Sequence, residues 1–187
     1  MQERKTDAQR EADDERLLTQ AGQGDLKAFE ALARRFERPI ANFVHRMGGS
    51  VERATEVFAE SMQKLAGELD SLPLSDRPEV WLFRTARALL AAQALQDTRE
   101  ISPRTLSSAL PDLEEEAAKT TPSSIRDRIG PWARDALLSL PRSRREALVL
   151  KVYQGLPYKD IARITGVPAG TVYYWVHISL SEIASRM

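Results

Sequence analysis

The residues best suited to form a binding site lie near the C-terminus, around a glycine that separates two short segments with the apolar spacing of helices. Residues 158–164 have the apolar spacing of a helix, and Gly166 follows where a positive φ would cost other residues free energy. Pro168 then pre-sets the backbone of a second helix. This order is that of a helix-turn-helix, which offers its second helix to the major groove of DNA. Chance helical packing explains the same apolar residues, so the pattern alone leaves both interpretations open.

The second helix of this pair is predicted to have one buried and one exposed face. Helical spacing places Val172, Val176, Leu180 and Ile183 inward. The helix has no Lys or Arg before Arg186, so Tyr and His side chains and the helix N-terminus would have to contact DNA. Cations beside the turn could contact phosphates, although ordinary surface charge explains each of them equally well. The candidate DNA-binding residues are Arg144, Arg145, Lys159, Arg163, Pro168, Ala169, Gly170, Thr171, Tyr173, Tyr174 and His177.

Catalytic and metal-binding patterns do not compete with this interpretation. The two histidines, His45 and His177, lie far apart in the sequence, and neither has metal-ligand spacing with a carboxylate. The chain has no cysteine, which excludes thiolate sites, and it has no glycine-rich phosphate loop. We therefore expect no enzymatic activity, no metal and no cofactor.

The overall composition predicts a globular protein of one ordinary domain or two small ones. The 187 residues are 29% charged and 42% hydrophobic, with 27 basic and 27 acidic side chains. The charged first sixteen residues cannot form a signal peptide, and no apolar stretch approaches the length that spans a bilayer. Together with the missing cysteines, this predicts a cytoplasmic protein without membrane insertion.

Apolar spacing of three and four residues predicts an all-α fold of two small helical domains joined by a flexible linker. The first domain is expected over residues 13–97, with Asp25 and Ser50 as helix caps and Pro39 in the first turn of a helix. Prolines and the acidic run Glu114–Glu116 indicate a linker over 98–124. The second domain, 125–187, is expected to hold four helices; it carries ten Lys/Arg against five Asp/Glu, a charge of +5 compatible with DNA. We expect its second helix to start at Pro141, to bury Ala147, Leu148 and Val152, and to end at Gly155.

A longer string in this second domain resembles a known family. Leu140-Pro141, Arg144, Arg145, Leu150, Gly155, Tyr158, Ile161-Ala162, Gly166 and residues 168–172 (PAGTV) resemble, in order and spacing, region 4 of the extracytoplasmic-function (ECF) sigma factors of the sigma-70 family. The resemblance implies a four-helix domain whose last helix recognises the −35 promoter element. It also implies core RNA polymerase, promoter DNA and an anti-sigma factor as partners.

The N-terminal half resembles region 2 of the same family more weakly. Gln23-Gly24-Asp25, Ala28-Phe29 and Leu32 resemble its opening helices, and Trp81-Leu82 with Ala86-Arg87 resembles the start of its region 2.3 helix. By the resemblance, Glu56 and Glu60 are the polymerase-binding candidates, although two glutamates four apart also describe a solvated helix edge. Ala88, Ala92 and Leu95 stand where the family has polar residues. An Ala/Leu surface cannot capture a flipped base.

Three functions follow from these patterns. The first is an ECF-type sigma factor that directs core RNA polymerase to promoters. The second is a sigma-like protein that acts by binding an anti-sigma factor or polymerase without melting DNA. The third is a helix-turn-helix transcriptional regulator that uses only its DNA-reading half.

Overall fold

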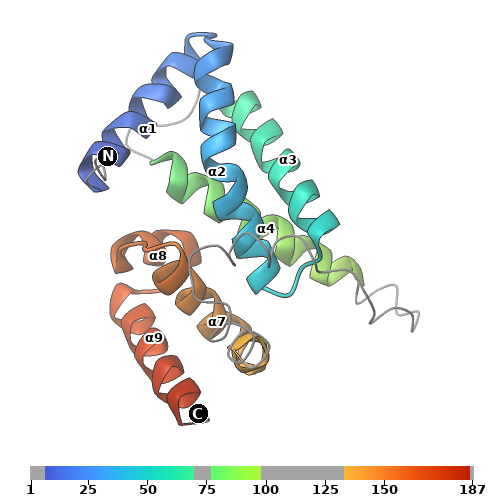
Figure 1. Cartoon of the computed structure of the whole chain (residues 1–187), viewed down its shortest axis with the longest axis vertical. Coiled ribbons are helices and arrows are strands. Elements are labelled where there is room, and N and C mark those ends of the chain that lie inside the picture. Colours follow the sequence, from blue (N-terminus) through green and yellow to red (C-terminus); the bar gives the residue numbers. More distant parts are fainter. Residues whose placement is uncertain (1–6, 70–76, 98–132, 186–187) are drawn as a thin grey trace, which may run out of the picture.

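The computed structural model describes residues 7–69, 77–97 and 133–185, and within these ranges the secondary structure is helical without strands. Figure 1 shows helices α1–α4 as one group and the helices after residue 133 as a second group beside it. The all-α fold with two helical groups is as predicted. The predicted linker, 98–124, lies outside the described residues, as does the start of the second domain.

Helices α1 (Asp7–Gly22) and α2 (Leu26–Arg46) form an antiparallel pair (Figure 1). Asp25 caps α2 as predicted, because its carboxylate accepts hydrogen bonds from the backbone N–H groups of Lys27 and Ala28 at 2.9 and 3.3 Å. Helix α1 begins well before the expected start near Asp13. Its first turns are tied down by α2, since Arg35 donates to the carbonyl of Arg10 at 3.1 Å.

The prediction that Pro39 begins a new helix was wrong, because Pro39 lies inside α2. A proline within a helix removes one backbone hydrogen bond and costs about 3 kcal/mol. The apolar stripe of α2 runs through this point, and Phe36, Ile40 and Phe43 on either side of the proline are all buried. Burial of each such side chain contributes about 1.5–3 kcal/mol, so packing outweighs the lost bond and keeps the helix continuous.

Helices α3 (Val51–Glu68) and α4 (Pro78–Asp97) complete the first group (Figure 1). Ser50 caps α3 as predicted, accepting from the N–H of Arg53 at 3.2 Å. The turn before it needs two glycines for different reasons. Gly48 has φ +99°, and a Cβ on Gly49 would lie 2.6 Å from Val44 Cγ1. The turn therefore folds α3 tightly back along α2.

The second group consists of a helical segment over 133–139, α7 (Arg142–Leu148), the π-helical turn η2 (Val149–Tyr153), α8 (Tyr158–Thr165) and α9 (Ala169–Ala184). The prediction that Val152 faces inward was wrong: it is 51% exposed, while Val149 and Leu150 are fully buried. A π-helical turn holds more residues than an α-helical turn. Side chains after Leu148 are therefore rotated relative to a continuous α-helix.

Helix α9 also departs from its predicted inward face. Val172 and Val176 are buried as expected, but Leu180 is 43% exposed and Ser179 is fully buried in its place. Helix α9 packs against both α7 and α8, so the direction of its buried stripe is set by two neighbours. A prediction from residue types alone places Leu180 in the core, because leucine is the larger and more apolar of the two residues.

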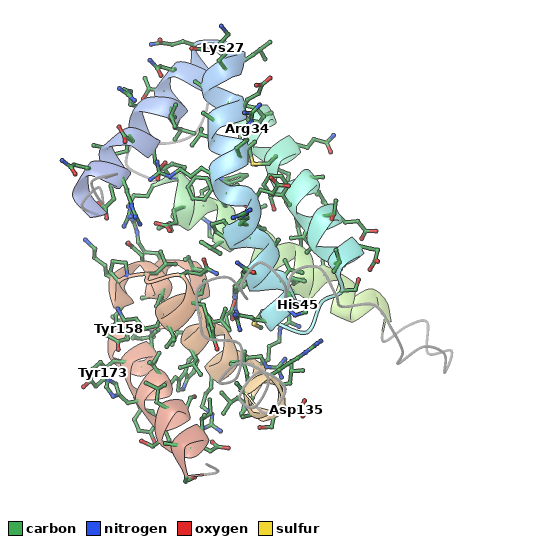
Figure 2. All side chains as sticks on the ribbon, in the orientation of Figure 1. Lys27, Arg34, His45, Asp135, Tyr158 and Tyr173 are labelled. Carbon is green, nitrogen blue, oxygen red and sulfur yellow. The ribbon has the colours of Figure 1, made fainter. Side chains whose placement is uncertain are left out.

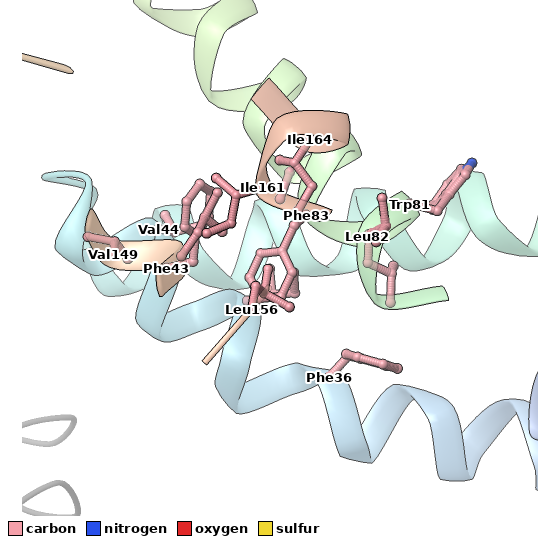
Figure 3. Packing of buried hydrophobic residues seen from close by; sticks show 14 of the residues in the cluster. Phe36, Phe43, Val44, Trp81, Leu82, Phe83, Val149, Leu156, Ile161 and Ile164 are labelled. Atoms are coloured by element: carbon pink, nitrogen blue, oxygen red, sulfur yellow. The ribbon is translucent and has the colours of Figure 1, made fainter. Parts of the chain in front are cut away.

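One hydrophobic core joins the two groups of helices. Figure 3 shows Phe43 and Val44 of α2 and Phe83 of α4 packed with Val149, Leu156, Ile161 and Ile164 of the second group. Phe43 and Phe83 meet edge to face, with ring centroids 5.5 Å apart. Helices α4 and α8 make the most extensive contact between the groups. The two helical groups are therefore docked on each other.

Candidate functional site

The turn between α8 and α9 has the geometry of a helix-turn-helix. Gly166 ends α8 in the left-handed conformation, with φ 74° and ψ 18°, and its N–H donates to the carbonyl of Ala162 at 2.9 Å. Nothing lies within 4 Å of a Cβ built on Gly166. Glycine is thus required here for its backbone conformation rather than for space. This confirms the role of Gly166 expected from the sequence.

The N-terminus of α9 is open to solvent. Pro168, Ala169 and Gly170 are exposed, Thr171 is half-buried, and no side chain caps the helix. The N–H groups of the first turn of a helix carry partial positive charge and bind phosphate oxygens. The arrangement can therefore hold a DNA phosphate without a lysine or arginine.

Three aromatic rings form a row along the exposed side of this unit. Tyr158 of α8 meets Tyr173 of α9 edge to face at 5.3 Å, and the His177 ring lies 4.1 Å from Tyr173. Lys151 Nζ lies 4.7 Å from the centre of the Tyr158 ring, which places a cation at the end of the row. Figure 2 shows Tyr158 and Tyr173 at the same edge of the second group. Tyr174 is 60% exposed beside this row.

The four cations that the sequence suggested as phosphate contacts differ in their surroundings: two are exposed and two have partners within the protein. Lys159 and Arg163 are exposed on α8. Arg144 pairs with Glu182 of α9 at 3.0 Å. Arg145 donates to the carbonyls of Leu138, Leu140 and Met47 at 2.6, 3.1 and 3.2 Å. In this conformation the guanidinium of Arg145 therefore bridges the two helical groups.

The polymerase-binding candidates Glu56 and Glu60 lie on the exposed side of α3. Glu56 pairs with Arg53 at 2.8 Å, and Glu60 lies 3.9 Å from Lys64. Both pairs are between neighbours on one helix, and exposed pairs of this kind contribute little to stability. The two carboxylates are therefore available to an external partner.

Helix α4 carries alanines on its exposed side. Ala88 and Ala92 are exposed, and the side chain of Leu95 lies outside the described residues. Alanine offers neither a hydrogen bond nor a ring to an unpaired base. Positions 88 and 92 of α4 therefore provide no group that could hold a flipped nucleotide.

The residues that the sequence did not reveal lie where the two groups meet. Arg77, at the start of α4, forms an ion pair with Asp160 of α8, and it also contacts Glu11 and Glu79 at 2.8 and 3.1 Å. We call these four residues the Arg77 cluster. The Asp160 side chain is only 2% exposed. No sequence signal indicates this pair, because its members are 83 residues apart.

Burial raises the pKa values of two carboxyl groups at this edge of the interface. Burial raises the pKa of Glu79 to about 7, against the opposing charge of Arg77. Burial likewise raises the pKa of nearby Asp14 to about 6, against Arg35 and Arg77. Glu79 and Asp14 therefore change protonation closer to neutral pH than ordinary carboxyl groups do.

Within 7–69, 77–97 and 133–185, no group of three or more His, Cys, Asp or Glu residues has the arrangement of a metal site. None of the helices in the described part of the chain has the length and apolar character needed to cross a bilayer.

The fold and the site define a two-part helical protein whose second part is a helix-turn-helix with an exposed aromatic recognition face. The family model of Sigma-70, region 4, matches residues 132–183, which contain α8, the turn at Gly166 and all but the last residue of α9. The ECF RNA polymerase sigma-E factor of Salmonella typhimurium (strain LT2) is 30% identical over 169 residues, covering 85% of this chain and 86% of the relative. The chain belongs to the ECF sigma factors of the sigma-70 family.

Another relative is similar to this chain in sequence, and two solved structures are similar to it in fold. The RNA polymerase sigma-H factor of Pseudomonas aeruginosa is 26% identical over 169 residues, 85% of this chain and 86% of its own. CnrH in complex with the cytosolic domain of CnrY has a TM-score of 0.67 at 18% identity, over 92% of this chain and 96% of that one. The sigma factor RpoE in complex with the anti-sigma factor NepR from Bartonella quintana has a TM-score of 0.66 at 19% identity, over 86% and 96%. The two structures share the fold of this chain.

Proposed function

We propose that this chain directs core RNA polymerase to promoters for transcription initiation. The observation that carries the proposal is the α8–Gly166–α9 unit, whose exposed aromatic face lies within the segment matched by sigma-70 region 4. A helix-turn-helix presents such a face to the major groove. The family of the chain assigns this module to promoter recognition.

We assign DNA contacts to two sets of residues. Tyr173, Tyr174 and His177 face the base edges, while Lys159 and Arg163 face phosphates beside the open N-terminus of α9. Residues 168–171 bring the backbone N–H groups of that N-terminus to a phosphate. Arg144 and Arg145 contact DNA only after leaving their present partners, so we assign them a secondary role.

The N-terminal group is proposed to bind core polymerase through Glu56 and Glu60. The support is their exposure on neighbouring turns of α3, where each carboxylate pairs only weakly with a cation of the same helix. An acidic helix face suits a basic surface on the partner. Charge reversal at both positions is therefore the direct test of this assignment, with polymerase binding as the readout.

An anti-sigma factor is the third proposed partner. A solved structure with the same fold, RpoE with the anti-sigma factor NepR, is a complex of that kind, and CnrH was solved with a bound protein partner, the cytosolic domain of CnrY. The proposal rests on these neighbours and on the family. We also propose that the protein acts in the cytoplasm, and that its domains comprise residues 13–97 and 125–187 joined by the linker 98–124.

A second candidate function is favoured by α4. Ala88 and Ala92 offer an unpaired base neither a hydrogen bond nor a ring at these two exposed positions, which suits a protein that binds polymerase or an anti-sigma factor without opening DNA. A helix-turn-helix regulator independent of polymerase is the remaining alternative.

Run-off transcription with purified core polymerase and a panel of genomic promoters separates the three functions. Initiation supports the sigma factor. Polymerase binding without an open complex contradicts initiation and supports the protein-binding function. DNA binding without polymerase binding supports the regulator. A Glu56→Lys, Glu60→Lys variant should lose polymerase binding, whereas Glu30→Lys, an exposed reversal on α2, should retain it.

A further inference from the structure

Helix α9 has few of the side chains that read bases by hydrogen bonds. In the major groove, Arg and Lys donate to guanine, Asn and Gln bond adenine at two atoms, and Asp and Glu accept from cytosine. The 16 residues of α9 include no Lys, Arg, Asn, Gln or Asp. Their one acidic residue, Glu182, lies in the last turn and pairs with Arg144 at 3.0 Å. The usual partners of guanine, adenine and cytosine are therefore missing from the part of α9 that would enter the groove.

The cations beside α9 lie on other elements. Lys159 and Arg163 are exposed on α8, the first helix of the helix-turn-helix, which crosses the DNA backbone instead of entering the groove. Lys151 of η2 donates to the carbonyl of Leu156 at 3.2 Å and lies 4.7 Å from the centre of the Tyr158 ring. These positions suit contacts with phosphates, which give affinity without a preference for any base.

The outward side of α9 is apolar and aromatic over its first two turns. Ala169 and Gly170 are exposed in the first turn, and Tyr173 and Tyr174 follow one turn later on the same side. The N-terminal residues of a recognition helix are the ones that contact base edges. Alanine and glycine are short and allow a close approach to the bases. The two tyrosine rings are then the large side chains that meet the floor of the groove.

The Tyr173 ring is held in position by its neighbours. The Tyr158 ring meets it at 5.3 Å and 66°, and the His177 ring lies 4.1 Å away at 41° (Figure 2 shows Tyr158 and Tyr173). A ring fixed in this way loses little further freedom on binding, so less of the contact energy is offset by ordering. Tyr173 is nevertheless 51% exposed, and Tyr174 is 60% exposed. Tyr173, Tyr174 and His177 form an exposed surface that we call the recognition face.

We propose that the recognition face identifies thymine through its C5-methyl group. This inference rests on the proposed function, in which α9 enters the major groove of promoter DNA. Thymine is the base that presents an apolar group at its major-groove edge, and apolar side chains contact that group. An aromatic ring buries a methyl group without needing any charge. The promoter element should therefore carry thymines opposite Tyr173 and Tyr174, in place of the guanines that an arginine or lysine would select.

Uracil provides the direct probe, because it pairs as thymine does and lacks only the methyl group. A site is first selected from a random duplex library with the full chain bound to core polymerase. Each thymine of the site is then replaced by uracil, one at a time, and each guanine by 7-deazaguanine, which lacks the N7 acceptor. We expect affinity to fall about fourfold at each contacted thymine, the factor that corresponds to burial of one methyl group. The 7-deazaguanine substitutions should leave affinity unchanged.

Variants of the two tyrosines assign the methyl contact to a ring. Tyr173→Phe and Tyr174→Phe remove only the hydroxyl group, so each should keep the preference for thymine over uracil. Tyr173→Ala and Tyr174→Ala should each abolish the preference at one of the contacted thymines. Leu180→Ala is the matched control, because Leu180 is an apolar residue of α9 that is 43% exposed but lies one turn beyond His177. It should keep the preference, and circular dichroism checks that every variant is folded.

The possible outcomes separate this inference from the proposed function. Equal affinity for thymine and uracil throughout a selected site overturns the methyl contact and leaves promoter recognition standing. A larger loss with 7-deazaguanine than with uracil also overturns it, because α9 would then read guanine. The same holds if the phenylalanine variants lose the preference, which would assign it to hydroxyl groups, or if both alanine variants keep it, which would assign it to DNA shape. If the polymerase-bound chain selects no site, the proposed recognition of DNA fails, and the methyl contact fails with it.

Discussion

Arg87 of α4 and Glu146 of α7 form an ion pair of 2.7 Å across the boundary between the two helical groups. The Glu146 side chain is 6% exposed, whereas that of Arg87 is 40% exposed. Burial raises the pKa of Glu146, against the effect of Arg87. The buried carboxylate therefore relies on a partner that water can reach.

Arg87→Ala should destabilise the protein in a pH-dependent way. Leaving a buried acceptor unpaired costs about 1–3 kcal/mol, and water near exposed Arg87 keeps the loss within this range. At pH 5 the unpaired Glu146 should take up a proton more readily, so the loss should be smaller than at pH 8. Urea unfolding at both pH values measures this. Adding Glu146→Gln should recover most of the loss, and equal losses at the two pH values would contradict the pairing.

Because the pKa values of Glu79 and Asp14 are raised in the folded state, we expect the stability of the protein to fall as pH rises. Glu79, with a pKa of about 7, faces Arg77, Asp14, Asp160 and Glu11, and Asp14, with a pKa of about 6, faces Arg35, Arg77, Asp13 and Glu11. Both pKa values exceed the ordinary ones, so between about pH 4 and 7 the folded state binds more protons than the unfolded state. The free energy of unfolding should decrease over this window, by up to about 1.4 kcal/mol per pH unit for each group.

Urea midpoints at pH 5, 6, 7 and 8 measure this slope, and Glu79→Gln should flatten it near pH 7. The exposed Glu60 serves as the control, since Glu60→Gln should leave the slope unchanged. A rising free energy of unfolding between pH 5 and 7 would show that other groups control the pH dependence.

Gly166→Val should lower stability by about 1–3 kcal/mol, because a β-branched residue is strained at φ 74°. The space around this position is open, so Gly166→Asn should cost less. Gly170→Ala is the control: it lies in α9 without a positive φ and should be neutral or stabilising. Thermal unfolding of the full chain gives all three values. Equal losses for Val and Asn would point away from backbone strain.

The recognition face should bind DNA with a shallow salt dependence. Tyr173, Tyr174 and His177 stand where Lys or Arg would release counter-ions from DNA phosphates, so the slope of log affinity against log salt should be small. Tyr174→Ala should cost about 1–3 kcal/mol on a selected site and little on random duplex, whereas Lys159→Ala should weaken both alike. Salt titrations of the polymerase-bound protein on both duplexes measure this. Equal effects of Tyr174→Ala on the two duplexes would remove its base contact.

Arg145→Ala should lower the stability of the protein rather than its affinity for DNA. Its guanidinium donates to three carbonyls, and removing it leaves part-buried acceptors unpaired at a cost of about 1–3 kcal/mol. Arg142→Ala provides the comparison on the same helix, because Arg142 is exposed, and it should change stability by less than about 0.5 kcal/mol. Unfolding by urea distinguishes the two variants. Unchanged stability in Arg145→Ala, together with weakened DNA binding, would show instead that Arg145 contacts a DNA phosphate.

Local chemistry made several features predictable from sequence. Asp25 and Ser50 cap helices because their short oxygen-bearing side chains reach the N–H groups two or three residues ahead. Gly166 marks the turn because only glycine adopts positive φ without strain. The exposed face of α9, with Tyr173, Tyr174 and His177, follows from helical period alone.

Tertiary packing decided what lies beyond the reach of local rules. The core stripe of α2 carries the helix through Pro39, and the π-helical turn after Leu148 exposes Val152 where an α-helix would bury it. The partners Arg77 and Asp160 are 83 residues apart, and Arg145 and Met47 are 98 apart. Hydrophobic spacing states which side of a helix is apolar, but it does not state which other helix covers that side. The docked arrangement and its buried ion pairs therefore exist only in the folded chain, where distant surfaces meet and must neutralise each other's charges.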